Sequence, residues 1–250
     1  MPDPRLLILG GTAEARTLAA LAVAAFGPDR VISSLAGVTK NPAAISGRVR
    51  TGGFGGADGL ARYLAEQPIG ALVDATHPFA VRISANAALA AAASGVPRVA
   101  LVRPPWPREP GDRWIEVDDL DEARAALDGR PASVFLAIGR KELERFKDLW
   151  GFRFHIRLFE APENVLPVND YGLTVARGPF TVAEEKALLE RERVATLVCK
   201  ASGGAEGYAK IAAACELGLT VVMVRRPPPP PGPTVATPEQ ALDLLERRLA

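Results

Sequence analysis

Short apolar runs alternate along this chain with stretches in which apolar residues recur every three or four positions. Residues 6–9 form an apolar run, two glycines follow, and from Thr12 onward Ala and Leu recur at helical spacing. Continuous apolar runs are typical of parallel strands that are covered on both faces. The pattern therefore predicts an α/β protein built from strand–turn–helix units.

The same pattern gives the expected elements of both halves of the chain. Strands are expected at residues 6–9, 31–35, 71–75, 99–102, 134–138, 154–158, 173–176, 196–199 and 221–224. Helices are expected at residues 13–25, 58–66, 79–93, 141–147, 182–192, 207–217 and 238–249. The last helix should begin with Thr237 as N-cap and Pro238 at its first position.

Two segments resemble each other. Residues 71–105 and residues 196–228 each run strand, polar turn, alanine-rich helix, Gly, strand, Arg, Pro. We predict two Rossmann-like parallel-sheet domains, residues 1–108 and 109–250, with the active site in the cleft between them. The proline-rich stretch 225–234 could be a ligand of a proline-reading domain, but we expect a stiff surface connector.

Composition narrows the class of protein. Hydrophobic residues make up 48% and charged residues 24%, and the net charge is +1. This balance excludes an overall field for nucleic acid or a membrane surface. No signal peptide and no membrane helix is expected, and a soluble cytoplasmic protein follows. With only Cys199, Cys215, His77 and His155 as soft ligands, no metal site is predicted.

Candidate binding residues follow from the rule that ligands lie beyond the carboxyl ends of the strands in a doubly wound sheet. The first turn reads Gly10-Gly11-Thr12-Ala13-Glu14 and does not spell G-x-G-x-x-G, yet it precedes a helix whose free N–H groups suit phosphate. The turns that this rule selects contain Gly10, Gly11, Thr12, Ala13, Glu14, Arg16, Gly37, Thr39, Lys40, Thr76, His77, Pro78, Gly139, Arg140, Lys200, Ser202, Gly203 and Gly204.

The second turn indicates which dinucleotide would bind. Residues 33–42 contain no acid to hold the ribose hydroxyls of NAD. Thr39 and Lys40 stand there, and Arg48 and Arg50 follow, which suits a 2′-phosphate and therefore NADP. Ordinary surface cations are the alternative interpretation.

Two further turns carry candidate chemistry. His77 in "DATHPFA" is expected over the nicotinamide end of a bound cofactor, with Pro78 at the start of the next helix. Lys200, Ser202 and Gly203-Gly204 form an anion-binding concavity, and Lys210 projects from the helix that follows. Tyr208 and Lys210 are only two residues apart, so they are not the Y-x-x-x-K pair of short-chain dehydrogenases, which argues against a simple alcohol or ketone reductase.

Together, "LILGGTAEAR", "VDATHPFAVRISANA" and "KASGGAEGYAKIAAACELGLTVVMVRRP" resemble the precorrin-6A reductases of cobalamin biosynthesis over nearly the whole chain. The resemblance implies NADPH-dependent reduction of a double bond of the precorrin-6A macrocycle to give precorrin-6B. It implies that the first glycine turn binds pyrophosphate. Arg140, Lys141, Lys200 and Lys210 would bind the carboxylate arms of the macrocycle. Lys200, His77 and Tyr208 are the candidate proton donors, unranked by the sequence.

Several alternatives stay open at this point. The substrate could be the cobalt-containing form of the anaerobic pathway. The protein could be a methyltransferase of the same pathway that uses S-adenosylmethionine, or a tetrapyrrole carrier without activity. The residues do not fix the oligomeric state, for which a monomer is the working expectation, with a small tetrapyrrole as the partner.

Overall fold

The computed structural model describes residues 3–37, 44–127 and 132–249. The chain divides into two compact units: unit 1 comprises Met1–Pro104 and Pro227–Ala250, and unit 2 comprises Pro105–Arg226. Each unit contains one six-stranded sheet, which we call sheet 1 and sheet 2, and all of the strand pairs described are parallel. The predicted fold class, α/β with two Rossmann-like parallel sheets, is therefore confirmed.

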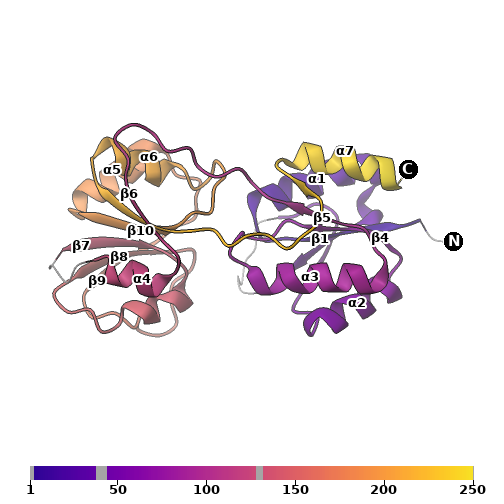
Figure 1. Cartoon of the computed structure of the whole chain (residues 1–250), viewed down its shortest axis with the longest axis horizontal. Coiled ribbons are helices and arrows are strands. Elements are labelled where there is room, and N and C mark those ends of the chain that lie inside the picture. Colours follow the sequence, from indigo (N-terminus) through magenta and orange to yellow (C-terminus); the bar gives the residue numbers. More distant parts are fainter. Residues whose placement is uncertain (1–2, 38–43, 128–131, 250) are drawn as a thin grey trace. The chain divides into compact units, whose positions relative to one another are not determined.

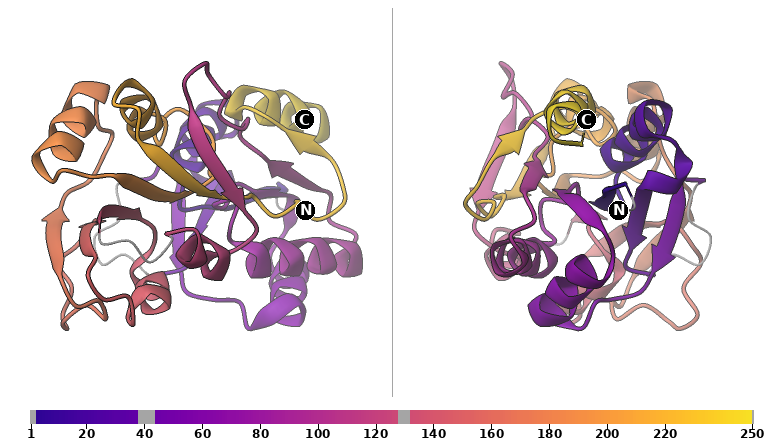
Figure 2. Two further views of the ribbon diagram at one scale, coloured as in Figure 1. Left: turned by 60° about the vertical axis from the view of Figure 1, so that its left-hand side comes forward. Right: turned by 90° about the vertical axis from the view of Figure 1, so that its right-hand side faces the viewer.

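Sheet 1 has the strand order β12-β5-β4-β1-β2-β3, which is the order of dinucleotide-binding folds. Helices α1 and α7 cover one face of this sheet and α2 and α3 cover the other (Figure 1 and Figure 2). The elements are β1 (Arg5–Leu9), α1 (Ala13–Phe26), η1 (Pro28–Arg30), β2 (Val31–Leu35), β3 (Arg48–Thr51), α2 (Gly56–Glu66), β4 (Ile69–Asp74), α3 (Val81–Ser94), β5 (Arg98–Leu101), β12 (Thr234–Val235) and α7 (Pro238–Leu249).

Strand β1 shows why the apolar runs predict strands with two covered faces. Leu6 and Ile8 belong to the core under α1 and α7, whereas Leu7 and Leu9 belong to the core under α2 and α3. All four side chains are buried because successive residues of a strand point to opposite faces. Burying each of them contributes about 1.5–3 kcal/mol.

Sheet 2 has the strand order β6-β11-β10-β7-β8-β9. Its elements are β6 (Arg113–Val117), α4 (Leu120–Ala125), β7 (Ser133–Ala137), η2 (Arg140–Phe146), β8 (Arg153–Leu158), β9 (Tyr171–Val175), α5 (Val182–Arg191), β10 (Thr196–Lys200), α6 (Ala209–Glu216) and β11 (Thr220–Val224). Helices α5 and α6 share one core with one face of the sheet. The helix expected at residues 141–147 is the 3₁₀ helix η2.

The two similar segments occupy the same position in their sheets. In sheet 1, β4 neighbours β1 and is followed by α3 and β5; in sheet 2, β10 neighbours β7 and is followed by α6 and β11. The point where the strand order reverses therefore lies between β1 and β4 in sheet 1 and between β7 and β10 in sheet 2. Ligands of such sheets bind beside this point.

The expected domain boundary needs a correction at the C-terminal end. A division into residues 1–108 and 109–250 puts the last helix in the second domain, but residues from Pro227 onward belong to unit 1. There β12 pairs with β5, and α7 contributes Ala241, Leu245 and Leu249 to the core that it shares with α1. The apolar stripe of α7 is buried in unit 1 although it follows unit 2 in the chain.

Candidate functional site

The first glycine turn, residues 10–14, joins β1 to α1 at the carboxyl edge of sheet 1. Gly11 has φ +114°, which favours glycine, and a Cβ built there would meet no atom of the described residues within 4 Å. Thr12 caps α1, since its Oγ1 accepts the N–H of Ala15 at 3.1 Å. The N–H groups of Ala13 and Glu14 have no acceptor inside the helix, so this end of α1 suits an anion.

Glu14 places a carboxylate in the first turn of α1, where it pairs with an arginine that the sequence analysis did not select. Its Oε1 lies 3.5 Å from Nη1 of Arg103, and both side chains are largely buried. Arg103 follows β5 at the carboxyl edge of the same sheet. The Arg-Pro ending after the strand, which both similar segments have, was a signal that could have drawn attention to this residue.

Arg50, on β3, extends its side chain to the end of β2, the strand after which an NAD-binding protein carries its acid. Its Nη1 donates to Oγ of Ser34, near the end of β2, and to the carbonyl oxygen of Gly52, both at 2.9 Å, and its Nη2 donates to that of Gly53 at 3.2 Å. The guanidinium also lies 3.8 Å from the centroid of the Phe54 ring. These contacts fix a half-buried cation at the carboxyl edge. Ser34 was not among the expected site residues.

The other expected phosphate ligands separate in the structure. Arg48 lies at the amino end of β3, where its Nη2 pairs with Oδ1 of Asp29 at 3.1 Å, so the expectation that it joins Arg50 at a phosphate is not supported. Thr39 and Lys40 lie outside the described residues. Gly37 has φ +77°, and a Cβ there would come within 2.9 Å of Thr51 Cγ2, so only glycine fits against the end of β3.

The His77 turn, residues 74–80, joins β4 to α3. Asp74 Oδ1 accepts the N–H of Thr76 at 3.2 Å and its hydroxyl at 2.7 Å. Nδ1 of the exposed His77 accepts the N–H of Phe79 at 3.3 Å. The helix does not start at Pro78 as expected, because the N–H of Ala80 donates to the His77 carbonyl at 2.7 Å and closes a turn first.

The structure joins these two turns directly. Oγ1 of Thr12 donates to the carbonyl of Ala75 at 2.9 Å, and the N–H of Ala75 donates to the carbonyl of Leu9 at 3.0 Å. The N–H of Gly10 donates to the backbone carbonyl of Ser34 at 2.9 Å. The glycine turn, the His77 turn and the end of β2 therefore form one continuous edge at the reversal point between β1 and β4.

In unit 2, Lys200 and the turn after β7 meet at the corresponding reversal point. Nζ of Lys200 forms an ion pair with Oε1 of Glu142. The other oxygen, Oε2, accepts the N–H of Gly139 at 2.8 Å. Arg140 and Lys141 are exposed in the same turn. The structure thus brings three of the predicted substrate-binding cations to one edge, and Lys200 already binds a carboxylate there.

The second glycine turn, which follows β10, is fixed through its carbonyl groups. Arg226 Nη2 donates to the carbonyl oxygen of Ser202 at 2.8 Å, and Trp106 Nε1 donates to the carbonyl oxygen of Gly204 at 2.7 Å. Gly203 and Gly204 have φ of +65° and +74°. The carbonyl oxygens of Ser202 and Gly204 are thus occupied by protein donors, and the N–H of Ser202 donates to the carbonyl of Lys200 at 2.6 Å. Trp106 and Arg226 were not expected at this turn.

Lys210 and Tyr208, on the helix after that turn, are engaged within unit 2. Lys210 Nζ donates to the carbonyl of Gly207 at 2.7 Å and lies 5.2 Å from the centroid of the Trp106 ring. Burial, together with the carboxylates of Glu109 and Asp112, raises the pKa of Tyr208, which keeps its phenol protonated. Burial likewise raises the pKa of the Cys199 thiol to about 11, so this residue is an inert core thiol.

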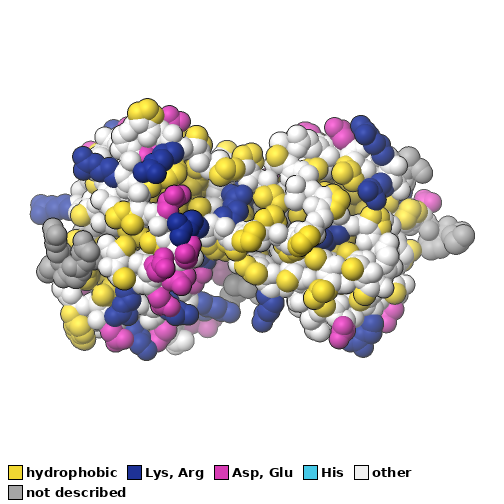
Figure 3. Space-filling model, in the orientation of Figure 1, with side chains coloured by type: hydrophobic (Ala, Val, Ile, Leu, Met, Phe, Trp, Pro, Cys, Tyr) yellow, Lys and Arg dark blue, Asp and Glu magenta, His cyan; other side chains and the backbone are white. Residues whose placement is uncertain are grey.

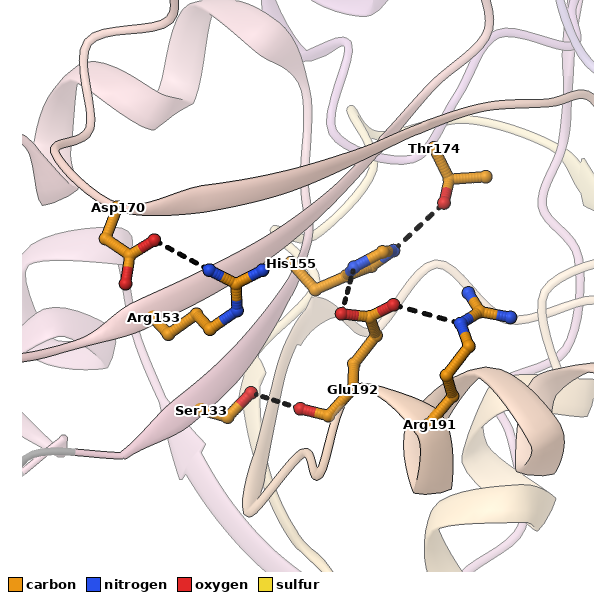
Figure 4. Close-up of polar contacts among 7 residues, drawn as sticks. All are labelled: Ser133, Arg153, His155, Asp170, Thr174, Arg191 and Glu192. Atoms are coloured by element: carbon orange, nitrogen blue, oxygen red, sulfur yellow. Dashed lines mark hydrogen bonds and ion pairs between the residues drawn. The ribbon is translucent and has the colours of Figure 1, made fainter.

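His155 lies away from these turns, in a polar cluster near the amino end of sheet 2 (Figure 4). Its Nε2 is 3.2 Å from Oγ1 of Thr174, and its Nδ1 is 3.6 Å from Oε2 of Glu192, whose Oε1 accepts from Arg191 at 3.0 Å. Burial lowers the pKa of His155, although Glu192 opposes this. His155 itself is buried and lies away from the carboxyl edge that carries Lys200, which indicates a structural role.

The described part of the chain also shows whether metal-binding clusters or membrane-spanning helices are present and how surface charge is distributed. In it, no group of three His, Cys, Asp or Glu side chains could hold a metal ion. None of its helices is long and apolar enough to cross a membrane. On the face shown in Figure 3, basic and acidic side chains are interspersed.

Comparison with known proteins identifies the family. The model of the family "Precorrin-6x reductase CbiJ/CobK" matches residues 5–246, nearly the whole chain. The chain belongs to the CbiJ/CobK precorrin-6x reductase family. The family expected from the three sequence motifs is therefore confirmed.

Named relatives and a solved structure agree with this CbiJ/CobK assignment. The chain is 47% identical to a precorrin-6A reductase of Sinorhizobium sp, over 100% of this chain and 95% of the relative. It is 29% identical to a cobalt-precorrin-6A reductase of Priestia megaterium, over 96% and 97% of the two chains. A solved CobK precorrin-6A reductase superposes with a TM-score of 0.93 at 43% identity, covering 98% of this chain and 97% of that one.

Proposed function

We propose that this CbiJ/CobK family member is an oxidoreductase of cobalamin biosynthesis that reduces precorrin-6A to precorrin-6B with NADPH. The observation that carries the proposal is the continuous edge formed by the first glycine turn and the His77 turn, joined by the bond from Thr12 Oγ1 to the Ala75 carbonyl at 2.9 Å. This edge lies at the reversal point of a sheet with the strand order of dinucleotide-binding folds.

The residues present fit NADPH. The first turn of α1 provides N–H groups for the pyrophosphate, and the positive φ of Gly11 keeps side-chain atoms away from it. Arg50, held by Ser34 and the carbonyl groups of Gly52 and Gly53, provides a fixed cation for the 2′-phosphate. When bound, the cofactor supplies the hydride.

The carboxylate arms of the substrate fit the cations of unit 2. Lys200 pairs with the carboxylate of Glu142 at this edge, so a carboxylate of the macrocycle would bind Lys200 in exchange for Glu142. The exposed Arg140 and Lys141 lie in the adjoining turn. Lys210, which donates to Gly207, and the Ser202–Gly204 backbone complete the proposed set.

Reduction of a double bond also needs a proton, for which three side chains of this chain are candidates. In neutral His77 the proton lies on Nε2, because Nδ1 accepts the N–H of Phe79 at 3.3 Å. Lys200 carries an ammonium proton beside Glu142. Tyr208 keeps its phenolic proton because burial raises its pKa. Each could deliver a proton to the reduced macrocycle.

Activity assays distinguish this function from its alternatives. Purified protein should oxidise NADPH in the presence of precorrin-6A, with one equivalent of precorrin-6B formed. The cobalt form of the substrate, assayed in parallel, should react more slowly, in line with the higher identity to a precorrin-6A reductase than to a cobalt-precorrin-6A reductase. A carrier would bind precorrin-6A without turnover, and that result would refute the proposal.

A further inference from the structure

The proline strap, residues 227–233, carries the chain back into unit 1 and is held there by Arg98. This residue begins β5, and its side chain is 5% exposed. Its Nη2 donates to the carbonyl of Pro231 at 2.8 Å and to that of Pro230 at 3.3 Å. A Cβ at Gly232, which has φ +134°, would lie 3.0 Å from the same nitrogen, so glycine permits this close approach.

The same guanidinium faces the His77 turn. Arg98 Nη1 lies 4.0 Å from Oδ2 of Asp74, and the Asp74 side chain is also 5% exposed. The other carboxylate oxygen, Oδ1, accepts both the N–H and the hydroxyl of Thr76. The Thr76 hydroxyl lies 3.2 Å from Oγ of Ser84 in the first turn of α3. One continuous set of contacts therefore runs from the strap, through a buried ion pair, to the turn that presents His77.

Capping of the turn alone does not explain a charged pair at this place. An asparagine at position 74 could accept the same two bonds from Thr76 without a charge. A buried ion pair carries a large desolvation cost and is weak evidence for stability. What the pair adds is a defined position for the turn, because two opposite charges 4.0 Å apart attract each other more strongly in a poorly hydrated setting than in water. The turn is also held from its other side, where Thr12 donates to Ala75.

We propose that Arg98 and Asp74 are positioning residues of the reductase: together with the proline strap they hold the His77 turn in the conformation that receives the nicotinamide end of the cofactor. This inference rests on the proposed function. It gives the polyproline sequence a role beyond that of a connector, because its carbonyl groups orient Arg98. Arg98 and Asp74 act through Thr76 and His77.

The test combines hydrogen exchange without cofactor with NADPH titration. Arg98→Met removes the guanidinium and keeps the aliphatic stem, Arg98→Lys keeps the charge, and Asp74→Asn keeps the cap on Thr76. Arg157→Met is the matched control: Arg157 Nη2 donates to the buried Glu185 at 2.7 Å in unit 2, with side chains 14% and 4% exposed. Melting temperature is measured for every variant.

Arg98→Met should speed amide exchange at residues 76 and 80 at least tenfold and raise the NADPH Kd at least tenfold. Arg98→Lys and Asp74→Asn should also speed exchange at these residues and raise the NADPH Kd, but by less than Arg98→Met. Arg157→Met should lower the melting temperature and leave both the exchange rates at residues 76 and 80 and the NADPH Kd unchanged. The inference is overturned if Arg98→Met only lowers the melting temperature, with exchange and Kd as in the wild type.

The two proposals fail in different ways. A wild-type protein that does not bind NADPH would refute the proposed function, while exchange at residues 76 and 80, measured without cofactor, would still decide whether Arg98 positions the turn. If Arg98→Met does not fold, Arg98→Lys and Asp74→Asn are judged by the same exchange criterion. Unchanged exchange in both would overturn the positioning role.

Discussion

Replacing Arg50 with methionine tests the 2′-phosphate assignment, because it removes the guanidinium and keeps an unbranched side chain. In the wild type, three hydrogen bonds of 2.9, 2.9 and 3.2 Å and the Phe54 ring at 3.8 Å hold this group in one place. These bonds use three of the five N–H donors of arginine. The side chain therefore needs little ordering when it meets a phosphate, and most of the contact energy should appear as affinity.

The expected loss follows from the strength of such a contact. A hydrogen bond to a charged group contributes about 1.5–3 kcal/mol. Since about 1.4 kcal/mol corresponds to a tenfold change in Kd, the loss could be about 10- to 150-fold. Arg50 is half-buried, and solvent screening favours the lower end of that range. We expect the NADPH Kd to rise about tenfold, with the NADH Kd nearly unchanged.

Fluorescence titrations of NADPH and NADH against wild type and variant measure this preference. Arg48→Met is the control, because Arg48 pairs with Asp29 at the amino end of the strand and should leave both constants unchanged. If the wild type binds both cofactors equally, or if Arg50→Met weakens them equally, the 2′-phosphate does not lie at Arg50.

Three further predictions use the same protein. Gly11→Val forces a branched residue into φ +114°, at a cost of about 1–3 kcal/mol. It should abolish NADPH binding while the circular dichroism spectrum shows that the fold is retained. Normal NADPH binding by this variant would mean that the dinucleotide binds elsewhere. Lys200→Ala should lower kcat/KM for precorrin-6A about tenfold to a hundredfold and leave the NADPH affinity unchanged. If the variant instead loses NADPH binding and keeps the KM for precorrin-6A, the two ligands have been assigned to the wrong units. Because burial lowers the pKa of His155, the unfolded state binds more protons, so stability should fall as pH drops below about 6.5. His155→Gln should flatten that dependence in thermal melts, and an unchanged slope would exclude His155 as its source.

The sequence predicts the interior strands of both sheets and one edge strand, β9, and the strands that it misses all lie at sheet edges. Strands are predicted at residues 6–9 and 31–35, and the structure has β1 and β2 there. The unpredicted strands β3, β6 and β12 are edge strands. Edge strands need fewer apolar residues, and β3 reads RVRT, so periodicity carries no signal for them.

Short segments of the sequence also carried the signal for the family. A glycine pair before a capped helix, the DATHPFA turn and the absence of an acid after the second strand pointed to a dinucleotide and to the family, and these are properties of short segments. Arg48 and Arg50 looked equivalent at that level, two residues apart in a cationic stretch. Strand register decided between them, because it put one beside Asp29 and the other beside Ser34.

Only the tertiary structure decided the long-range pairings. Glu142 and Lys200 are 58 residues apart, and they meet because β7 and β10 are neighbours in sheet 2. Arg98 reaches carbonyl groups 132 and 133 residues further along the chain because β12 returns to pair with β5. Periodicity reports which face of an element is buried, but the partner that covers it is chosen by the packing of the whole chain. The partners of Lys200 and Arg98 were therefore beyond the reach of the sequence pattern.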